Sequence, residues 1–197
     1  MDEASYERFD TNAGFQAAIS RLLGQPGREL RIFDPDGTAL RLNDPGHIAE
    51  LESFLVASRT RRIYLVVHDT DPLTRHCPRM MALLARFEGF LQVSRTRRIY
   101  MVVHNTEHLT RQCPRLLTLL RRFSHAMQIN RTHEEIREVQ DAFLLLDAMH
   151  YVRRPMASLF RGAMGLGDEN EGQALRGRFG EIWSASYPAV SSTTVGL

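Results

Sequence analysis

Arg62-Ile-Tyr-Leu-Val-Val67 and Arg98-Ile-Tyr-Met-Val-Val103 are the stretches that decide the fold of this 197-residue chain, and they are two copies of one segment. They belong to a tandem 36-residue repeat, 52–87 and 88–123, which aligns without a gap and with about two-thirds of its positions identical. Both stretches are largely apolar on both faces, which is typical of a central strand in a parallel sheet covered by helices. Each is followed by a polar loop and then by a helical pattern that begins at a proline. The repeated unit is therefore one strand plus one helix.

The flanking sequence also alternates between strand and helix patterns. This alternation predicts a single α/β domain over 1–197, with a mainly parallel sheet flanked by helices. Residues 38–42 are compatible with a short hairpin arm or with an extended run, the glycine-containing stretch 155–167 reads as loop, and 191–197 reads as a loose polar tail. Periodicity and capping residues predict helices over 11–23, from Pro45 onward and over 169–185, and strands over 30–33, 126–130, 142–146 and 150–153.

The composition is that of a soluble globular protein, with 43% hydrophobic and 24% charged residues. A net charge of +2 makes nucleic acid an unlikely partner. The sequence has no run of apolar residues long enough to span a membrane, and it starts with acidic residues, so we expect no membrane association and a cytoplasmic location. All 25 basic residues are arginine, which excludes a catalytic lysine or a phosphate-loop lysine and fits a GC-rich bacterial genome.

Two histidines, His68 and His104, stand at equivalent positions where the repeated strands end. Ligands of open α/β sheets bind beyond the carboxyl ends of the parallel strands, so this position favours a functional role. The alternative is a histidine that only closes the strand through hydrogen bonds to the loop. Cys77 and Cys113 are one repeat position seen twice, and no nearby base supports a catalytic thiol, so we expect both cysteines to be structural.

Arginines at the same edge are candidates for binding phosphate or carboxylate, because a guanidinium group binds such anions bidentately. By contrast, the clusters 59–62 and 95–98 lie where a helix ends and a strand begins, at the opposite edge, and we expect a structural role for them. The candidate ligand-binding residues are His68, His104, Arg75, Arg111, His133, Arg153 and Arg154.

Phe143-Leu-Leu-Leu-Asp147-Ala-Met-His-Tyr-Val, preceded by the charged turn His133-Glu-Glu, resembles the strand pair of the phospholipase D superfamily. More closely, the segment from Leu30 to Glu181-Ile-Trp183 resembles a bacterial phospholipase D-like domain of unknown function that occurs alone or behind acetyltransferase domains. This resemblance covers most of the chain and implies a phospholipase D-like topology.

The resemblance also implies a degenerate catalytic signature. Active members carry histidine, one residue, lysine, four residues and aspartate. Counting back from Asp147 places Gln140 at the histidine position and Ala142 at the lysine position. Both the nucleophile and the phosphate-binding lysine are therefore missing.

The sequence thus predicts a non-catalytic phospholipase D-like domain, without cofactor, metal or catalytic residues, that binds a small anionic ligand or a protein partner. One alternative is a hydrolase or transferase that uses His68 or His104 together with His133. Another is a dimeric scaffolding or regulatory module, in which a repeat unit can be exchanged between the two copies, because single-unit members of the superfamily often pair.

Overall fold

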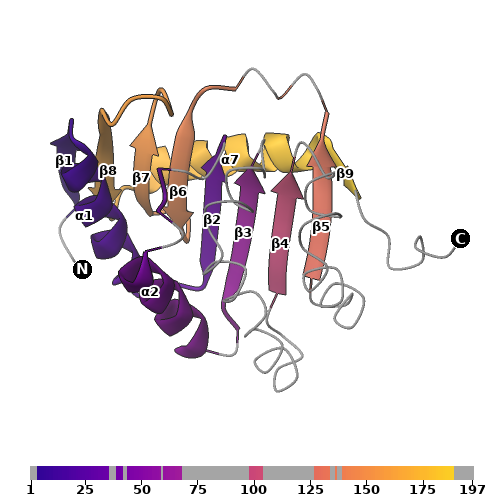
Figure 1. Cartoon of the computed structure of the whole chain (residues 1–197), viewed down its shortest axis with the longest axis horizontal. Coiled ribbons are helices and arrows are strands. Elements are labelled where there is room, and N and C mark those ends of the chain that lie inside the picture. Colours follow the sequence, from indigo (N-terminus) through magenta and orange to yellow (C-terminus); the bar gives the residue numbers. More distant parts are fainter. Residues whose placement is uncertain are drawn as a thin grey trace, which may run out of the picture.

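A computed structural model shows an α/β fold built on one large mixed sheet (Figure 1). The structure describes residues 4–35, 39–41, 44–58, 60–67, 98–103, 127–133, 136 and 139–188. Within these residues the sheet has nine strands in the order β1-β8-β7-β6-β2-β3-β4-β5-β9. The strands are β1 Ser5–Phe9, β2 Glu29–Asp34, β3 Arg62–Val67, β4 Arg98–Val103, β5 Met127–Thr132, β6 Ala142–Leu146, β7 His150–Arg154, β8 Gly162–Leu166 and β9 Ser186–Pro188.

Helices cover both faces of the sheet, as Figure 1 shows with α1 and α2 in front and α7 behind. The helix α1 (Asn12–Leu23) is capped by the Thr11 side chain, and α2 (Pro45–Val56) is capped by Asp44. The third described helix, α7 (Glu169–Ser184), is capped by Asp168. None of the helices within the described residues is long and apolar enough to cross a bilayer.

The sheet is parallel only at its centre. β2, β3, β4 and β5 pair in parallel, whereas the other described pairings, including β2 with β6 and β6 with β7, are antiparallel. The expectation of a mainly parallel sheet therefore describes the centre and not the flanks. The reason is local: the left-handed residues Asp147 and Ala148 turn β6 directly back into β7, so no crossover helix separates these strands.

The strands of the two repeat copies, β3 and β4, lie side by side, and equivalent repeat positions are paired. Arg62 of β3 pairs with Arg98 of β4, and the register continues to Val67 beside Val103. Each repeat position of one strand therefore lies beside its own duplicate. The predicted helices of the two units lie outside the described residues.

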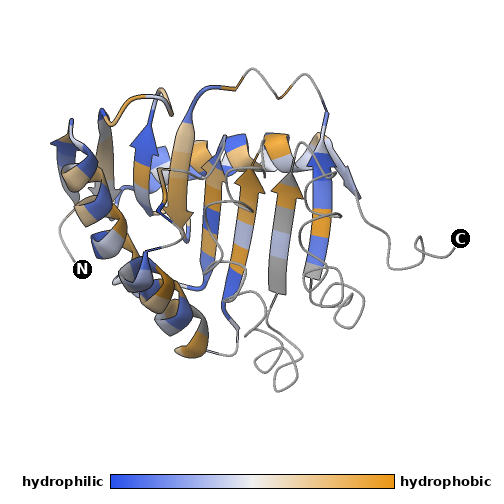
Figure 2. Cartoon of the chain, in the orientation of Figure 1, coloured by the Kyte–Doolittle hydropathy of each residue, from blue (hydrophilic) through white to orange (hydrophobic). Residues whose placement is uncertain are grey.

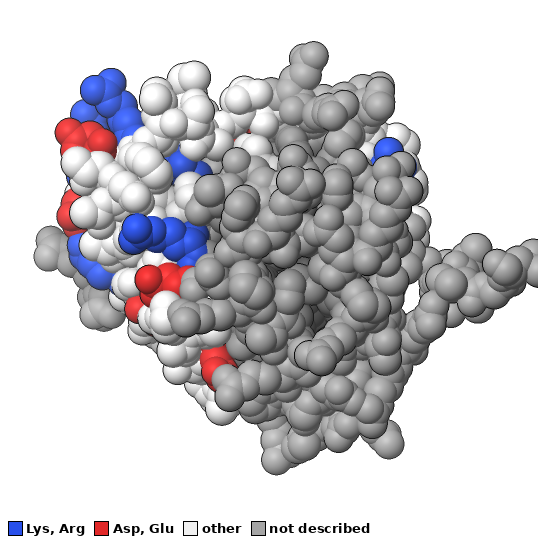
Figure 3. All heavy atoms as spheres, in the orientation of Figure 1, with Lys and Arg blue, Asp and Glu red and all other residues white. Residues whose placement is uncertain are grey.

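Hydrophobic strand residues form the core on the α7 face, and Figure 2 shows the apolar character of the central strands. Alternate residues of a strand share a face, so Phe33, Val66 and Val102 lie in one row across three strands. They pack in one cluster with Phe179 and Ile182 of α7. On the other face, Arg21 of α1 pairs with Glu7 of β1, and Figure 3 shows basic and acidic side chains of described residues interspersed there.

The stretch predicted as loop, 155–167, contains the strand β8, and sequence reasoning also missed β1 and β9. Glycine normally weakens a strand, but two glycines of β8 lie where a side chain would collide. A Cβ on Gly165 would lie 2.5 Å from the Tyr151 ring, and one on Gly162 would lie 2.1 Å from the Arg153 carbonyl oxygen. The low strand propensity of β8 therefore reflects close packing against β7.

Candidate anion-binding site

The parallel strands β2 to β5 end at one edge of the sheet, which we call the carboxyl edge, and β7 runs in the same direction and ends there too. We call the opposite edge the amino edge. Four of the predicted ligand-binding residues, His68, His104, Arg75 and Arg111, lie outside the described residues. The structure therefore places three of the predicted residues, His133, Arg153 and Arg154, all at the carboxyl edge.

The guanidinium group of Arg154 is buried and already engaged. Its Nη2 donates to Asp34 Oδ2 at 2.8 Å, and its Nη1 donates to the Ala157 carbonyl at 2.6 Å. The rings of Phe15 and Phe160 lie 4.4 and 5.7 Å from the guanidinium carbon. This arrangement ties β7 to β2 and to the segment after β7, so the geometry of Arg154 suits a structural ion pair.

Arg153 faces the other side of β7 and pairs with Glu171 of α7. It also lines an open cavity of about 630 Å³ at the carboxyl edge, together with Arg8 and Arg161. The Asp10 carboxylate lines the same cavity, so its three arginines and one aspartate give a formal charge of +2. Arg153 is thus the predicted residue best placed for a ligand at this edge.

His133 follows β5, and its ring lies 4.9 Å from the ring of Tyr187 in β9, with the two planes tilted by 52°. In the strand order, β6, β2, β3 and β4 stand between β7 and β5. With neighbouring strands about 4.8 Å apart, His133 and Arg153 lie on the order of 20 Å from each other. The structure therefore does not bring these two predicted residues into one site.

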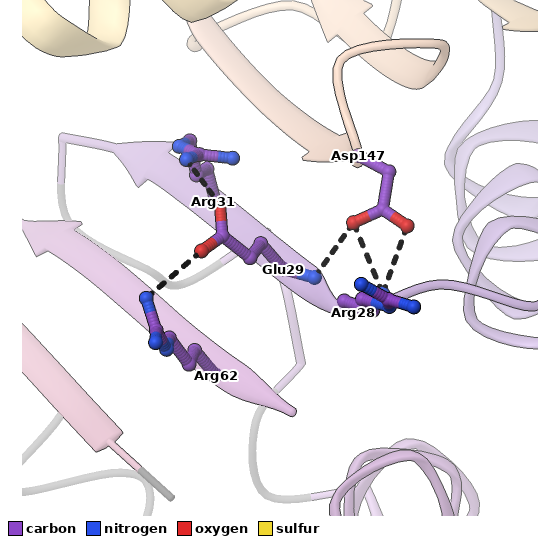
Figure 4. Close-up of polar contacts among 5 residues, drawn as sticks. All are labelled: Arg28, Glu29, Arg31, Arg62 and Asp147. Atoms are coloured by element: carbon purple, nitrogen blue, oxygen red, sulfur yellow. Dashed lines mark hydrogen bonds and ion pairs between the residues drawn. The ribbon is translucent and has the colours of Figure 1, made fainter. Parts of the chain in front are cut away.

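At the amino edge, Asp147 joins the end of β6 to the start of β2. Its Oδ1 accepts the backbone N–H groups of Arg28 at 3.0 Å and Glu29 at 2.7 Å, and its Oδ2 accepts that of Arg28 at 2.9 Å. Figure 4 shows both carboxylate oxygens directed at these backbone nitrogens. Asp147 therefore holds the end of β6 to the start of β2 through backbone hydrogen bonds.

Next to it, one carboxylate bridges two arginines on neighbouring strands (Figure 4). Glu29 Oε2 lies 2.6 Å from Arg31 Nη2, and Glu29 Oε1 lies 3.2 Å from Arg62 Nη1. These residues lie on the α7 face, because they are two or four residues away from the core residues Phe33 and Val66 on the same strands. Glu29 therefore orients two guanidinium groups on the open strip of sheet beside α7.

Tyr64 contacts the same two arginines, Arg31 through its ring and Arg62 through its hydroxyl group. It stacks on Tyr100 with centroids 4.6 Å apart, and the guanidinium carbon of Arg31 lies 5.1 Å from its centre. A hydrogen bond with the Tyr64 hydroxyl raises the pKa of Arg62 above its ordinary value. Burial raises the pKa of Tyr64, so this hydroxyl remains protonated and Arg62 remains charged throughout the physiological range.

These groups line a cavity of about 480 Å³, which we call the amino-edge cavity. Four of its lining residues are arginines, and two, Glu29 and Asp147, are acidic, so its formal charge is +2. Within the residues that the structure describes, the guanidinium groups of Arg28 and Arg176 have no ion-pair or hydrogen-bond partner. The complete lining is Arg28, Glu29, Arg31, Thr60, Arg62, Asp147 and Arg176.

Sequence reasoning assigned Arg62 a structural role and did not single out Arg28, Arg31 or Arg176. The available signal in the sequence was the Arg-x-x-Arg pattern of Arg28 and Arg31, which spans the start of β2. This pattern gives no information about α7, which lies more than a hundred residues later in the chain. Only the packing of α7 on the sheet brings Arg176 to this edge.

The profile of a family described as a domain of unknown function, DUF7931, matches residues 84–192, which is more than half of the chain. The chain belongs to this family. No curated protein matches the chain. The matched part of the DUF7931 domain contains Asp147, Arg153, Arg154 and Arg176, whereas the cavity arginines of β2 and β3 precede it.

Solved structures with similar folds have very different sequences. One is Nuc, a phospholipase D family member from Salmonella typhimurium, at 7% identity and a TM-score of 0.49, covering 96% of this chain and 100% of that chain. NucT from Helicobacter pylori shows 7% identity and a TM-score of 0.43, with 94% and 99% covered. The archaeal chromatin protein TrmBL2 shows 7% identity and a TM-score of 0.46, with 93% of this chain and 54% of that chain covered.

Proposed function

We propose that this chain is a non-catalytic phospholipase D-like domain that binds a phosphate-bearing anion in the amino-edge cavity. The observation that carries the proposal is that four guanidinium groups line one cavity of ligand size and that two of them, those of Arg28 and Arg176, have no partner among the described residues. Guanidinium groups bind phosphate bidentately. Both acidic residues in the lining already have partners, which limits their repulsion of an incoming anion.

The absence of catalysis rests on the positions that correspond to the phospholipase D signature. Ala142 is only 3% exposed and presents no functional group, and Gln140 lacks a nucleophilic side chain. The Gln140 carbonyl accepts a hydrogen bond from the Ala157 N–H at 2.6 Å, so the segment after β7 is fixed against this position. The carboxyl edge near His68 and His104, where the sequence predicts an anion site, is a second candidate location for the same function.

Inorganic phosphate is the probe that tests this proposal. Isothermal titration calorimetry and thermal unfolding should show phosphate binding that is weakened at least about fivefold by Arg176→Gln, because one cation of the cavity is lost. Arg161→Gln is the matched control: Arg161 is also an exposed arginine, but it lines the cavity at the carboxyl edge. Binding that is lost in Arg161→Gln and kept in Arg176→Gln would place the site at the carboxyl edge and contradict the proposal, as would the absence of binding at millimolar phosphate.

A further inference from the structure

The positive charge of the amino-edge cavity is arranged in two groups. In the first group, Arg31 and Arg62 share the single carboxylate of Glu29, which leaves one positive charge. Figure 4 shows the Arg31 and Arg62 side chains, on β2 and β3, at the Glu29 carboxylate, whereas the Asp147 carboxylate meets the backbone of Arg28 and Glu29. The first group is held in place by two ion pairs and by the Tyr64 ring.

The second group consists of Arg28, Arg176 and the carboxylate of Asp147, and it also carries one net positive charge. Close packing of α7 brings Arg176 here. A Cβ on Gly172 would lie 2.2 Å from the Ala148 carbonyl oxygen, so this turn of α7 touches the β6–β7 turn. Arg176 is one helical turn further along the same side of α7, because residues four apart on a helix are neighbours.

We propose that the cavity binds a ligand with two linked phosphate groups, of the diphosphate type, with one phosphate on each group of arginines. This inference rests on the proposed function. An orthophosphate that engages one group leaves the positive charge of the other group uncompensated. A diphosphate compensates both, and its second contact is intramolecular once the first has formed.

Among the described residues, the aromatic side chains near this cavity do not add a stacking site for a nucleobase. One side of the Tyr64 ring is covered by Tyr100, and Arg31 lies over the ring. The edges of Tyr64 and Tyr100 meet the Trp183 ring, with centroids 5.9 and 5.5 Å away. Recognition therefore depends on the phosphates and not on a base attached to them.

Titration calorimetry with orthophosphate and with inorganic pyrophosphate, at equal ionic strength, tests this inference. We expect the wild-type protein to bind pyrophosphate at least about tenfold more tightly than orthophosphate. Arg62→Gln, in the first group, and Arg28→Gln, in the second, should each reduce this preference to less than about threefold. Arg178→Gln should leave it unchanged, because Arg178 lies on α7 but pairs with Asp141 outside the cavity.

The outcomes separate this inference from the proposed function. Equal affinities for the two anions, with both weakened by Arg28→Gln, would leave the anion site in place and overturn its specificity for two phosphates. A preference for pyrophosphate that survives in both cavity variants would also overturn the two-group assignment. Failure of both anions to bind would overturn the proposed function itself.

Discussion

Arg154 Nη2 lies 2.8 Å from Asp34 Oδ2, and this buried ion pair connects β7 to β2 across the intervening strand β6. The two side chains are 1% and 2% exposed. Removing one partner of a buried pair leaves an uncompensated charge, so Asp34→Ala should lower the free energy of unfolding by about 3–5 kcal/mol. Urea denaturation measures this loss.

The matched control for that variant removes both charges together. Asp34→Leu combined with Arg154→Met should recover most of the lost stability, because no buried charge remains. A loss below about 1 kcal/mol in Asp34→Ala would show that the ion pair does not stabilise the fold.

Replacement of glycine by alanine should have opposite effects on stability at two positions with different surroundings, Gly165 and Gly177. Gly165→Ala places a Cβ 2.5 Å from the Tyr151 ring and should cost about 1–3 kcal/mol. Gly177 lies on the exposed side of α7, where an added Cβ meets nothing within 4 Å, so Gly177→Ala should stabilise by about 0.4–1 kcal/mol. Thermal unfolding of both variants checks the signs, and equal effects would contradict the packing of β8 against β7.

The stability of the domain should fall at high pH because of Tyr151. Burial, reinforced by the neighbouring Asp168 carboxylate, raises the pKa of Tyr151 to about 12. An unfolded chain loses this proton near pH 10, whereas the folded chain keeps it, so the stabilising contribution is complete below about pH 10 and is lost as the pH rises toward 12. Urea denaturation at pH 9 and pH 11 should show this loss, and Tyr151→Phe should reduce the pH dependence. An unchanged slope in that variant would assign the loss to other groups.

The wild-type protein should not hydrolyse phosphodiesters. Gln140 and Ala142 supply neither a nucleophile nor a cation, and loss of the nucleophile from such a set typically lowers the rate by several orders of magnitude. Metal-independent release of nitrophenol from bis-(p-nitrophenyl) phosphate measures this activity. Turnover that disappears in a folded Gln140→Ala variant would show that the site is catalytic.

Removal of one repeat unit should leave a folded domain. Deleting 88–123 joins Phe87 to Ser124 and recreates the junction that Phe123 and Ser124 already make. Because β3 and β5 both pair in parallel with β4, β5 can take the place of β4 beside β3. We expect cooperative urea unfolding with a smaller m-value, since less surface is exposed. A shortened protein without near-ultraviolet circular dichroism would show that the two copies depend on each other.

Much of the local structure was predictable because it depends on short-range patterns. The helix α1 follows from its apolar periodicity and the Thr11 cap, and α2 follows from Asp44 and the proline after it. The apolar strands β3, β4 and β6 were also predictable, because a strand covered on both faces has few polar residues. The sequence misled where strand propensity conflicts with packing, as in β8, whose glycines make room for Tyr151 and β7. The strands β1 and β9 were also missed.

The sequence by itself therefore determined most of the elements and the presence of a repeat, because hydrophobic periodicity, capping and repetition are properties of neighbouring residues. Only the tertiary structure decided which charged residues meet. It pairs Arg154 with Asp34, which are 120 positions apart, and it brings Arg176 of α7 to the same cavity as Arg28 and Arg62. These contacts arise from the strand order and from the way in which α7 packs across the sheet, and no spacing along the chain encodes either of them.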